Sequence, residues 1–266
     1  MNNNISKAFQ NGKAFIGFVT GGDPSCSKTV EFILQMEKAG ADIVEIGIPF
    51  SDPIAEGQVI QEANIRALNA GANVEKMFDI VKDVRKVSKI PLVFLTYFNP
   101  VFRYGNAGDS ESCGTEAFLK KSCECGLDGI IIPDLPYEES FDVKNIAAKH
   151  GIDLISLIAP TSEQRISEIA KNANGFIYVV SSMGVTGVRS NIQTDLASIL
   201  KTIKASSTVP AAIGFGINTV QQAKDFSKIA DGIIVGSAIV KIVASHGENA
   251  APHIYEYVKS MKDAVR

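Results

Sequence analysis

The segment ADIVEIGIP, residues 41–49, consists mostly of apolar residues and ends at a proline. A short apolar run bounded by turn residues is typical of a strand that is buried on both faces, as in a parallel sheet. Seven more runs of this kind occupy residues 14–20, 90–97, 127–134, 152–158, 175–181, 208–214 and 230–236. We therefore expect eight parallel strands.

Segments with the helical spacing of apolar residues lie between these strands, at residues 29–39, 74–87, 141–149, 165–171, 196–203 and 253–261. Eight strand–helix units of about 30 residues predict a single (β/α)8 TIM barrel over residues 1–266, with extra N-terminal and loop helices. An open doubly wound sheet is the alternative, but eight units would make it very wide, and no G-x-G-x-x-G follows the first strand. Ser162 and Asn218 stand where helix N-caps are expected.

The composition argues against several classes of protein. The 266 residues carry a formal net charge of −3 and no Lys/Arg-rich run, so neither nucleic acid nor an anionic membrane is an expected partner. The first residues lack the apolar run of a signal peptide, and no apolar stretch approaches the ~20 residues of a membrane span, which predicts a cytoplasmic protein. Cys123 and Cys125 are separated by one residue, unlike the ligands of a zinc site, so we expect reduced cysteines and no metal.

Glycines at the ends of the last two strands predict a phosphate site. Catalytic groups of this fold lie at the carboxyl ends of the strands, and phosphate binds in the loops after the seventh and eighth. The seventh strand ends at Gly214 and Gly216, and the eighth ends at Gly236 and Ser237, just before a helical run. Glycine lets the backbone approach a ligand, and a helix N-terminus offers free N–H groups to an anion. Gly-x-Gly alone is more often a turn, but two such turns at these strand ends favour a small phosphorylated ligand.

The second strand carries a carboxylate, Glu45, inside its apolar run. In a dry pocket the pKa of a glutamate rises, which suits a group that donates and recovers a proton near neutral pH. A Glu45 that faces outward or is paired structurally is the open alternative. The loop that follows carries Asp52 and Glu56, each of which is a candidate site acid or a solvated charge. Asp134, at the end of the fourth strand, is a further site group or a helix cap.

Five motifs resemble the tryptophan synthase α subunit family, and they occur in the family's order along nearly the whole chain. They are EIGIPFSDP (45–53), FVTGGDP (18–24), GVTG (184–187), GFGI (214–217) and GSAIV (236–240). The resemblance implies retro-aldol cleavage of indole-3-glycerol phosphate to indole and glyceraldehyde 3-phosphate, without a cofactor of its own. It also implies a β subunit partner that uses pyridoxal phosphate, in an α2β2 heterotetramer.

The resemblance also implies roles for individual residues. Glu45 matches the proton-donating glutamate, Glu56 the second catalytic carboxylate, and Tyr178 a tyrosine near the acid. The phosphate handle matches Gly187, Gly214, Gly216, Gly236 and Ser237, and the flat apolar pocket for indole would draw on Phe18, Leu95, Ile131, Ile158 and Phe215. Asp52, Pro53 and Thr186 match loops that close over the site and contact the partner.

One loop departs from the family pattern. The family has Ala-Asp-Gly-Pro where this chain has Ala55-Glu56-Gly57-Gln58. Glutamate is one methylene longer than aspartate, and a misplacement of ~1 Å can cost ~10²-fold in rate. Without proline at position 58 the backbone is freer, so the loop can retreat and return the carboxylate to its place. We expect Glu56 to keep the family role through such a shift.

Two other functions compete with the lyase. The altered loop leaves open a regulatory subunit that activates the β subunit but cleaves little or no substrate itself. Another phosphate-binding barrel, such as a sugar-phosphate epimerase or isomerase, is weakened because no metal-ligand His cluster or catalytic Lys stands at the strand ends.

Overall fold

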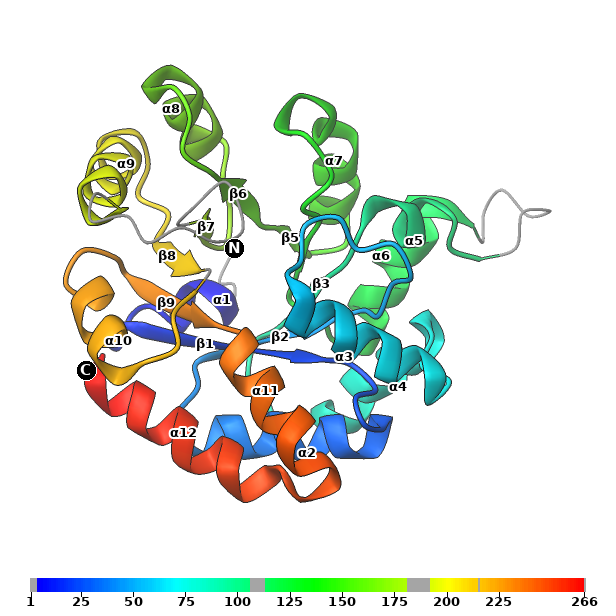
Figure 1. Ribbon diagram of the computed structural model, residues 1–266. Coiled ribbons are helices and arrows are strands. Elements are labelled where there is room, and N and C mark those ends of the chain that lie inside the picture. Colours follow the sequence, from blue (N-terminus) through cyan, green and yellow to red (C-terminus); the bar gives the residue numbers. More distant parts are fainter. Residues whose placement is uncertain (1–3, 106–112, 181–191, 215, 266) are drawn as a thin grey trace.

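The computed structural model describes residues 4–105, 113–180, 192–214 and 216–265 of the chain. All of its named strands belong to one parallel sheet with the order β5-β4-β3-β2-β1-β9-β8-β7-β6. The strands are β1 (Ala14–Thr20), β2 (Ile43–Gly47), β3 (Leu92–Leu95), β4 (Gly129–Ile131), β5 (Asp153–Leu154), β6 (Ser156–Ile158), β7 (Ile177–Val180), β8 (Ala211–Gly214) and β9 (Gly232–Val235). Because the two ends of this order, β5 and β6, are consecutive in the chain, the sheet curls into a nearly closed barrel with helices outside it (Figure 1). The predicted TIM barrel is confirmed.

Each of the eight predicted strands has a counterpart, but the fifth is divided. β5 pairs with β4 and β6 pairs with β7, and Ile155 lies between them. The N–H of Ile155 still donates to the carbonyl of Ile130 at 2.9 Å, so the backbone changes its neighbour at this residue without leaving the barrel. One sheet contains all the named strands, from Ala14 to Val235, and the single domain stays a prediction.

The helices cover the barrel and also occupy its loops. They are α1 (Asn4–Lys7), α2 (Cys26–Lys38), α3 (Gln58–Asn69), α4 (Val74–Arg85), α5 (Phe98–Phe102), α6 (Gly114–Cys125), α7 (Phe141–Lys149), α8 (Glu163–Lys171), α9 (Ile192–Ser206), α10 (Val220–Ser227), α11 (Ser237–His246) and α12 (Ala251–Ala264). The expected cap at Ser162 is confirmed, because its side chain accepts from the N–H of Arg165. The expected cap at Asn218 is wrong by one residue: Thr219 caps α10 and forms a capping box with Gln222.

Two apolar layers set the directions of the strand side chains. An outer layer packs between strands and helices, and an inner layer fills the barrel with Ile16, Ile43, Val93, Ile131, Ile155, Phe176, Ala212 and Ile234. Ile5 of the short helix α1 joins this inner layer and is fully buried. Because side chains alternate along a strand, Glu45 points to the same side of the sheet as Ile43, into the barrel.

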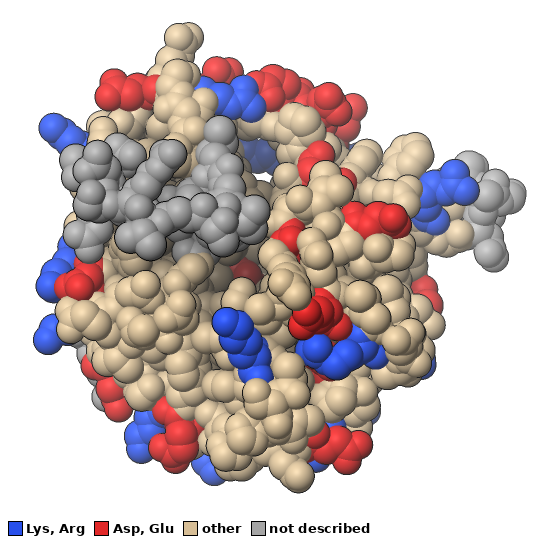
Figure 2. All heavy atoms as spheres, viewed as in Figure 1, with Lys and Arg blue, Asp and Glu red and all other residues tan. Residues whose placement is uncertain are grey.

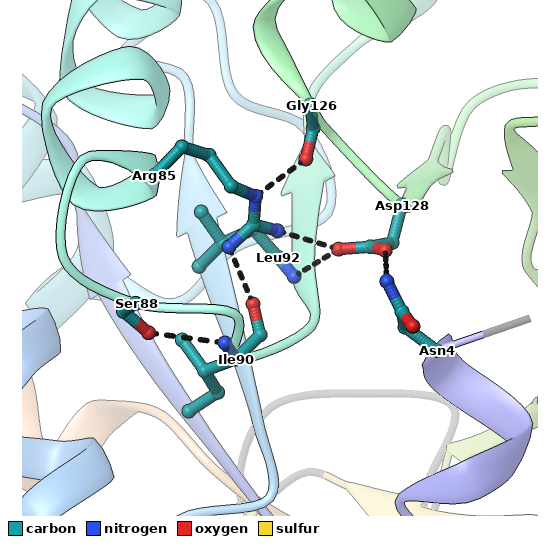
Figure 3. Close-up of polar contacts among 7 residues, drawn as sticks. All are labelled: Asn4, Arg85, Ser88, Ile90, Leu92, Gly126 and Asp128. Atoms are coloured by element: carbon teal, nitrogen blue, oxygen red, sulfur yellow. Dashed lines mark hydrogen bonds and ion pairs between the residues drawn. The ribbon is translucent and has the colours of Figure 1, made fainter.

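A polar network holds the end of the barrel at which the strands begin (Figure 3). The Arg85 guanidinium donates to an Asp128 carboxylate oxygen at 2.6 Å and to the carbonyls of Gly126 and Ile90. Asp128 also accepts from the N–H of Leu92 at 2.9 Å and from the side chain of Asn4 at 2.9 Å. The network thus ties α1 and α4 to the starts of two strands.

The surface of the described residues carries mixed charge. Figure 2 shows acidic and basic side chains interspersed on one face, with no continuous basic patch among the residues coloured there. Within the described part of the chain, no helix has both the length and the apolar character that crossing a bilayer requires.

Candidate active site

A cavity of about 880 Å³ opens beyond the carboxyl ends of the strands. Its walls include Glu56, Leu95, Leu157 and Tyr178, together with Ile155 from the division between β5 and β6. Apolar side chains make up much of the lining, and the acidic and phenolic groups are few. A cavity of this kind suits a largely apolar molecule that is oriented by a small number of polar groups.

Glu45 stands in the middle of β2 with 1% of its surface exposed. Its Oε1 has no hydrogen-bond partner among the described residues. Burial raises the pKa of this carboxyl to about 8, because the charged form loses its hydration. At neutral pH the group is therefore mostly protonated and can act as an acid. The alternative of an outward-facing or paired Glu45 is wrong for this structure.

Tyr178 on β7 lies beside Glu45 in the barrel and lines the cavity. Burial raises the pKa of its phenol, and the nearby Glu45 carboxylate raises it further. Gly214 on the adjacent strand β8 makes room for this ring: a Cβ there would lie 2.4 Å from the Tyr178 hydroxyl and from its Cε1. The structure thus gives Gly214 a packing task in addition to the predicted phosphate contact.

Glu56 follows β2 in the loop that leads into α3, and it lines the same cavity. The side chain of Asn64 donates to its Oε2 at 3.2 Å. Burial raises the pKa of Glu56, while hydrogen bonds from Tyr97 and Asn64 lower it. Glu56 therefore points inward, which was the open question about this loop.

The predicted indole wall is found only in part. Leu95 lines the cavity, and Phe18 lies inside the barrel, where its ring covers Gly47 of the adjacent strand. Ile131 belongs to the inner core layer and does not line the cavity. Ile158 packs in the outer layer, against the helices, and Leu157 beside it faces the cavity instead. The Ile158 prediction is wrong because alternate residues of β6 point to opposite faces.

The expected phosphate groups stand at the strand ends as the sequence suggests. Gly236 precedes α11 without a side-chain cap, and Ser237 begins that helix with an exposed side chain. Gly216 adopts a positive φ of 84°, a backbone conformation that favours glycine. Gly187, Thr186 and Phe215 lie outside the described residues.

The remaining candidate acids have ordinary local roles. Asp52 is exposed and accepts from the hydroxyl of Ser51, and Pro53 beside it is half-buried. Asp134 accepts from the N–H of Phe98 at 2.8 Å, at the start of α5, and it does not line the cavity. Among the described residues, no three His, Cys, Asp or Glu side chains converge in a way that could hold a metal ion.

Sequence reasoning missed Asn64 and Tyr97, two buried residues that contact the Glu56 loop. Both are buried, with 3% and 2% of their surfaces exposed. An asparagine on the buried face of a helix is a signal that could have been used, because a buried amide needs a polar partner. Tyr97 gives no such signal, since an aromatic residue after a strand is ordinarily core.

Known proteins resemble the chain over its whole length. A family model described as tryptophan synthase alpha chain matches residues 5–266. The tryptophan synthase alpha chain of Lacticaseibacillus casei is 48% identical over 261 residues, which cover 98% of this chain and 95% of that protein. That of Thermoanaerobacter sp. (strain X514) is 45% identical and covers 99% and 100% of the two chains.

Solved structures agree with these sequence relatives. The tryptophan synthase subunit alpha of Legionella pneumophila superposes with a TM-score of 0.88 at 33% identity, covering 100% of this chain and 99% of that one. A chain of the tryptophan synthase α2β2 complex from Pyrococcus furiosus superposes with a TM-score of 0.81, also at 33% identity, over 95% and 99% of the two chains. On the barrel, the inward-facing acids and these matches, the chain belongs to the tryptophan synthase alpha chain family.

Proposed function

We propose that this chain is a carbon–carbon lyase that cleaves indole-3-glycerol phosphate to indole and glyceraldehyde 3-phosphate. The observation that carries the proposal is Glu45, a buried carboxyl inside the barrel with a pKa of about 8. Cleavage requires a proton on C3 of the indole ring, and Glu45 is protonated at the pH where this transfer must occur. Family membership supports the same reaction.

The proposed reaction uses two carboxyl groups in sequence. Glu45 gives its proton to C3 while Glu56 takes the proton of the ring N–H, which leaves the C3 substituent on a saturated carbon. The hydroxyl next to that bond then loses its proton, its C–O bond becomes the aldehyde carbonyl, and the electrons of the broken C–C bond return to the ring. Glu45, now a carboxylate, accepts the hydroxyl proton, and the ring nitrogen takes its proton back from Glu56. Both carboxyl groups are thereby restored and indole leaves as the neutral molecule.

Other groups of the site would bind and orient the substrate. The start of α11, with Gly236 half-buried and Ser237 exposed, supports a phosphate contact, because N–H groups at a helix N-terminus attract anions. Gly187, Gly214 and Gly216 complete the proposed phosphate loops. Thr186 belongs to the loop proposed to close over the site. Phe18, Leu95, Leu157 and Phe215 are the proposed apolar walls, and Tyr178 lies against the acid.

We propose a β subunit as the partner, in an α2β2 complex like that of the Pyrococcus furiosus protein. Asp52 and Pro53, at the outer edge of the cavity loop, are the proposed contact and closure residues. Pyridoxal phosphate would belong to that partner and not to this chain. The cytoplasmic location stays a prediction.

The test is release of indole from indole-3-glycerol phosphate, measured with and without a β subunit. We expect the wild-type chain to release indole, and both Glu45→Gln and Glu56→Gln to lose this activity, while Glu256→Gln on the exposed face of α12 keeps it. A wild-type chain that activates the β subunit but never releases indole would establish the regulatory alternative. Near-normal turnover of Glu56→Gln would remove that residue from the mechanism.

A further inference from the structure

Gln61, Tyr97 and Asn64 form hydrogen bonds with the loop that carries Glu56. The Gln61 side chain donates to the Glu56 carbonyl at 2.8 Å, and the N–H of Ala55 donates to the Tyr97 hydroxyl at 2.9 Å. The third bond reaches the carboxylate itself, from the Asn64 side chain at 3.2 Å. The first two fix the backbone of the loop, and the third fixes the direction of the acid.

Asn64 and Tyr97 are themselves rigid. Both are almost completely buried, and the Tyr97 ring packs against that of Phe50 with 5.2 Å between the ring centroids. Buried polar atoms are shielded from water and must form hydrogen bonds within the protein. The side chains of Asn64 and Tyr97 form theirs with the loop and with the Glu56 carboxylate. Since the Tyr97 hydroxyl accepts from Ala55, its own proton is available to the Glu56 carboxylate, with which it forms a side-chain hydrogen bond.

We propose that Asn64 and Tyr97 are positioning residues, which hold the carboxylate of Glu56 at the cavity wall. We call this pair the Glu56 clamp. The proposal rests on the proposed function, because it assigns a geometric need to the second carboxylate of that reaction. A displacement of this carboxylate by about 1 Å is enough to cost ~10²-fold in rate.

The clamp also has an electrostatic consequence. Burial favours the neutral form of Glu56, whereas the two hydrogen bonds favour its carboxylate. Tyr97 is a titratable group that faces Glu56, and the Asp134 carboxylate is near enough to Tyr97 to raise the pKa of that phenol. The clamp therefore opposes the effect of burial on the pKa of Glu56, and its loss raises that pKa further.

The direct test is a titration of Glu56 by ¹³C NMR in the full-length chain with labelled glutamate carboxyls, with Glu56→Gln used to assign the signal. We expect the pKa of Glu56 to rise by about one unit in Tyr97→Phe and in Asn64→Ala. Tyr104→Phe is the matched control, because the Tyr104 hydroxyl also donates to a glutamate, Glu75, but far along the chain from the cavity loop. An unchanged pKa of Glu56 in both clamp variants would overturn the proposal.

A kinetic test follows from the same reasoning. With the β subunit present, the acidic limb of kcat/KM should move to higher pH in Tyr97→Phe, and the rate at neutral pH should fall about 10-fold or more. A loss of folded protein would lower the rate but could not move the limb. Asn174→Ala removes an equivalent bond to Asp153 at the other end of the barrel and should leave the limb in place. If the wild type releases no indole, the proposed function fails, and the titration still decides the clamp.

Discussion

Replacing Glu45 by Gln should stabilise the fold while it stops the reaction. The native carboxyl has a pKa of about 8, against an ordinary value of 4.5, because burial excludes its charged form. Between these two values the native state keeps a proton that the unfolded chain has released. Each pH unit in this window costs folding about 1.4 kcal/mol, so wild type at pH 7 is less stable than at pH 4.5 by about 3 kcal/mol from this group alone. A neutral glutamine carries no such cost.

The direction in which pH changes the stability contribution of Glu45 determines the pH range of the assay. The stability that the protonated carboxyl confers is complete below pH 4.5 and is lost as the pH rises toward 8. We would measure the free energy of unfolding in urea, for wild type and Glu45→Gln, at intervals from pH 5 to pH 8.5. The advantage of the variant should grow with pH and level off near 8, while indole release falls by about 10²–10⁴-fold.

A control on the helix surface separates this effect from the loss of any negative charge. Glu256→Gln, on the exposed face of α12, should track wild type at every pH. Parallel stability curves for wild type and Glu45→Gln would refute the reasoning, because they would mean that the native carboxyl titrates as it does in the unfolded chain.

Three further predictions concern side-chain packing in the barrel and the Arg85–Asp128 network. Gly214→Ala places a Cβ 2.4 Å from the Tyr178 ring, which must move by about 1 Å, so kcat/KM for indole release should fall about 10²-fold; an unaffected rate would show that the ring is not fixed there. Ile158→Ala should lower the free energy of unfolding by about 2–5 kcal/mol and leave KM unchanged, whereas Leu157→Ala should raise KM. The reverse pattern would show that Ile158, and not Leu157, contacts the substrate. Asp128→Ala leaves Arg85 unpaired and should cost about 3 kcal/mol in urea unfolding without a change in KM, and a stable variant would contradict the role given to this network.

The sequence was sufficient for the strands because each is an apolar run long enough to cross the barrel. It could not show the division of the fifth strand, since Ile155 is as apolar as its neighbours and only its hydrogen-bond partner differs. For the same reason, the apolar sequence of this strand did not reveal that the Ile158 side chain points to the outer face of the sheet. Where every residue of a strand is apolar, no alternation distinguishes the inner face from the outer one.

Glu45 was easier to recognise, because a single charge in an apolar strand must be explained by function or by pairing. The direction of Glu56 depended on partners that come from other elements, Asn64 on α3 and Tyr97 after β3. Their contacts arise only when the barrel closes, so neither spacing nor composition could reveal them. Family resemblance identified the acids but said nothing of what holds a glutamate at position 56.

The network around Arg85 and Asp128 lies at the end of the barrel opposite the cavity loops, and it bears on how such a protein evolves (Figure 3). Its bonds fasten the scaffold without touching any group proposed to meet the substrate. Substitutions in the loops around the cavity should therefore leave the supporting end unaffected. Because the stabilising network and the cavity loops are at opposite ends, the loop sequences can change during evolution with little loss of barrel stability.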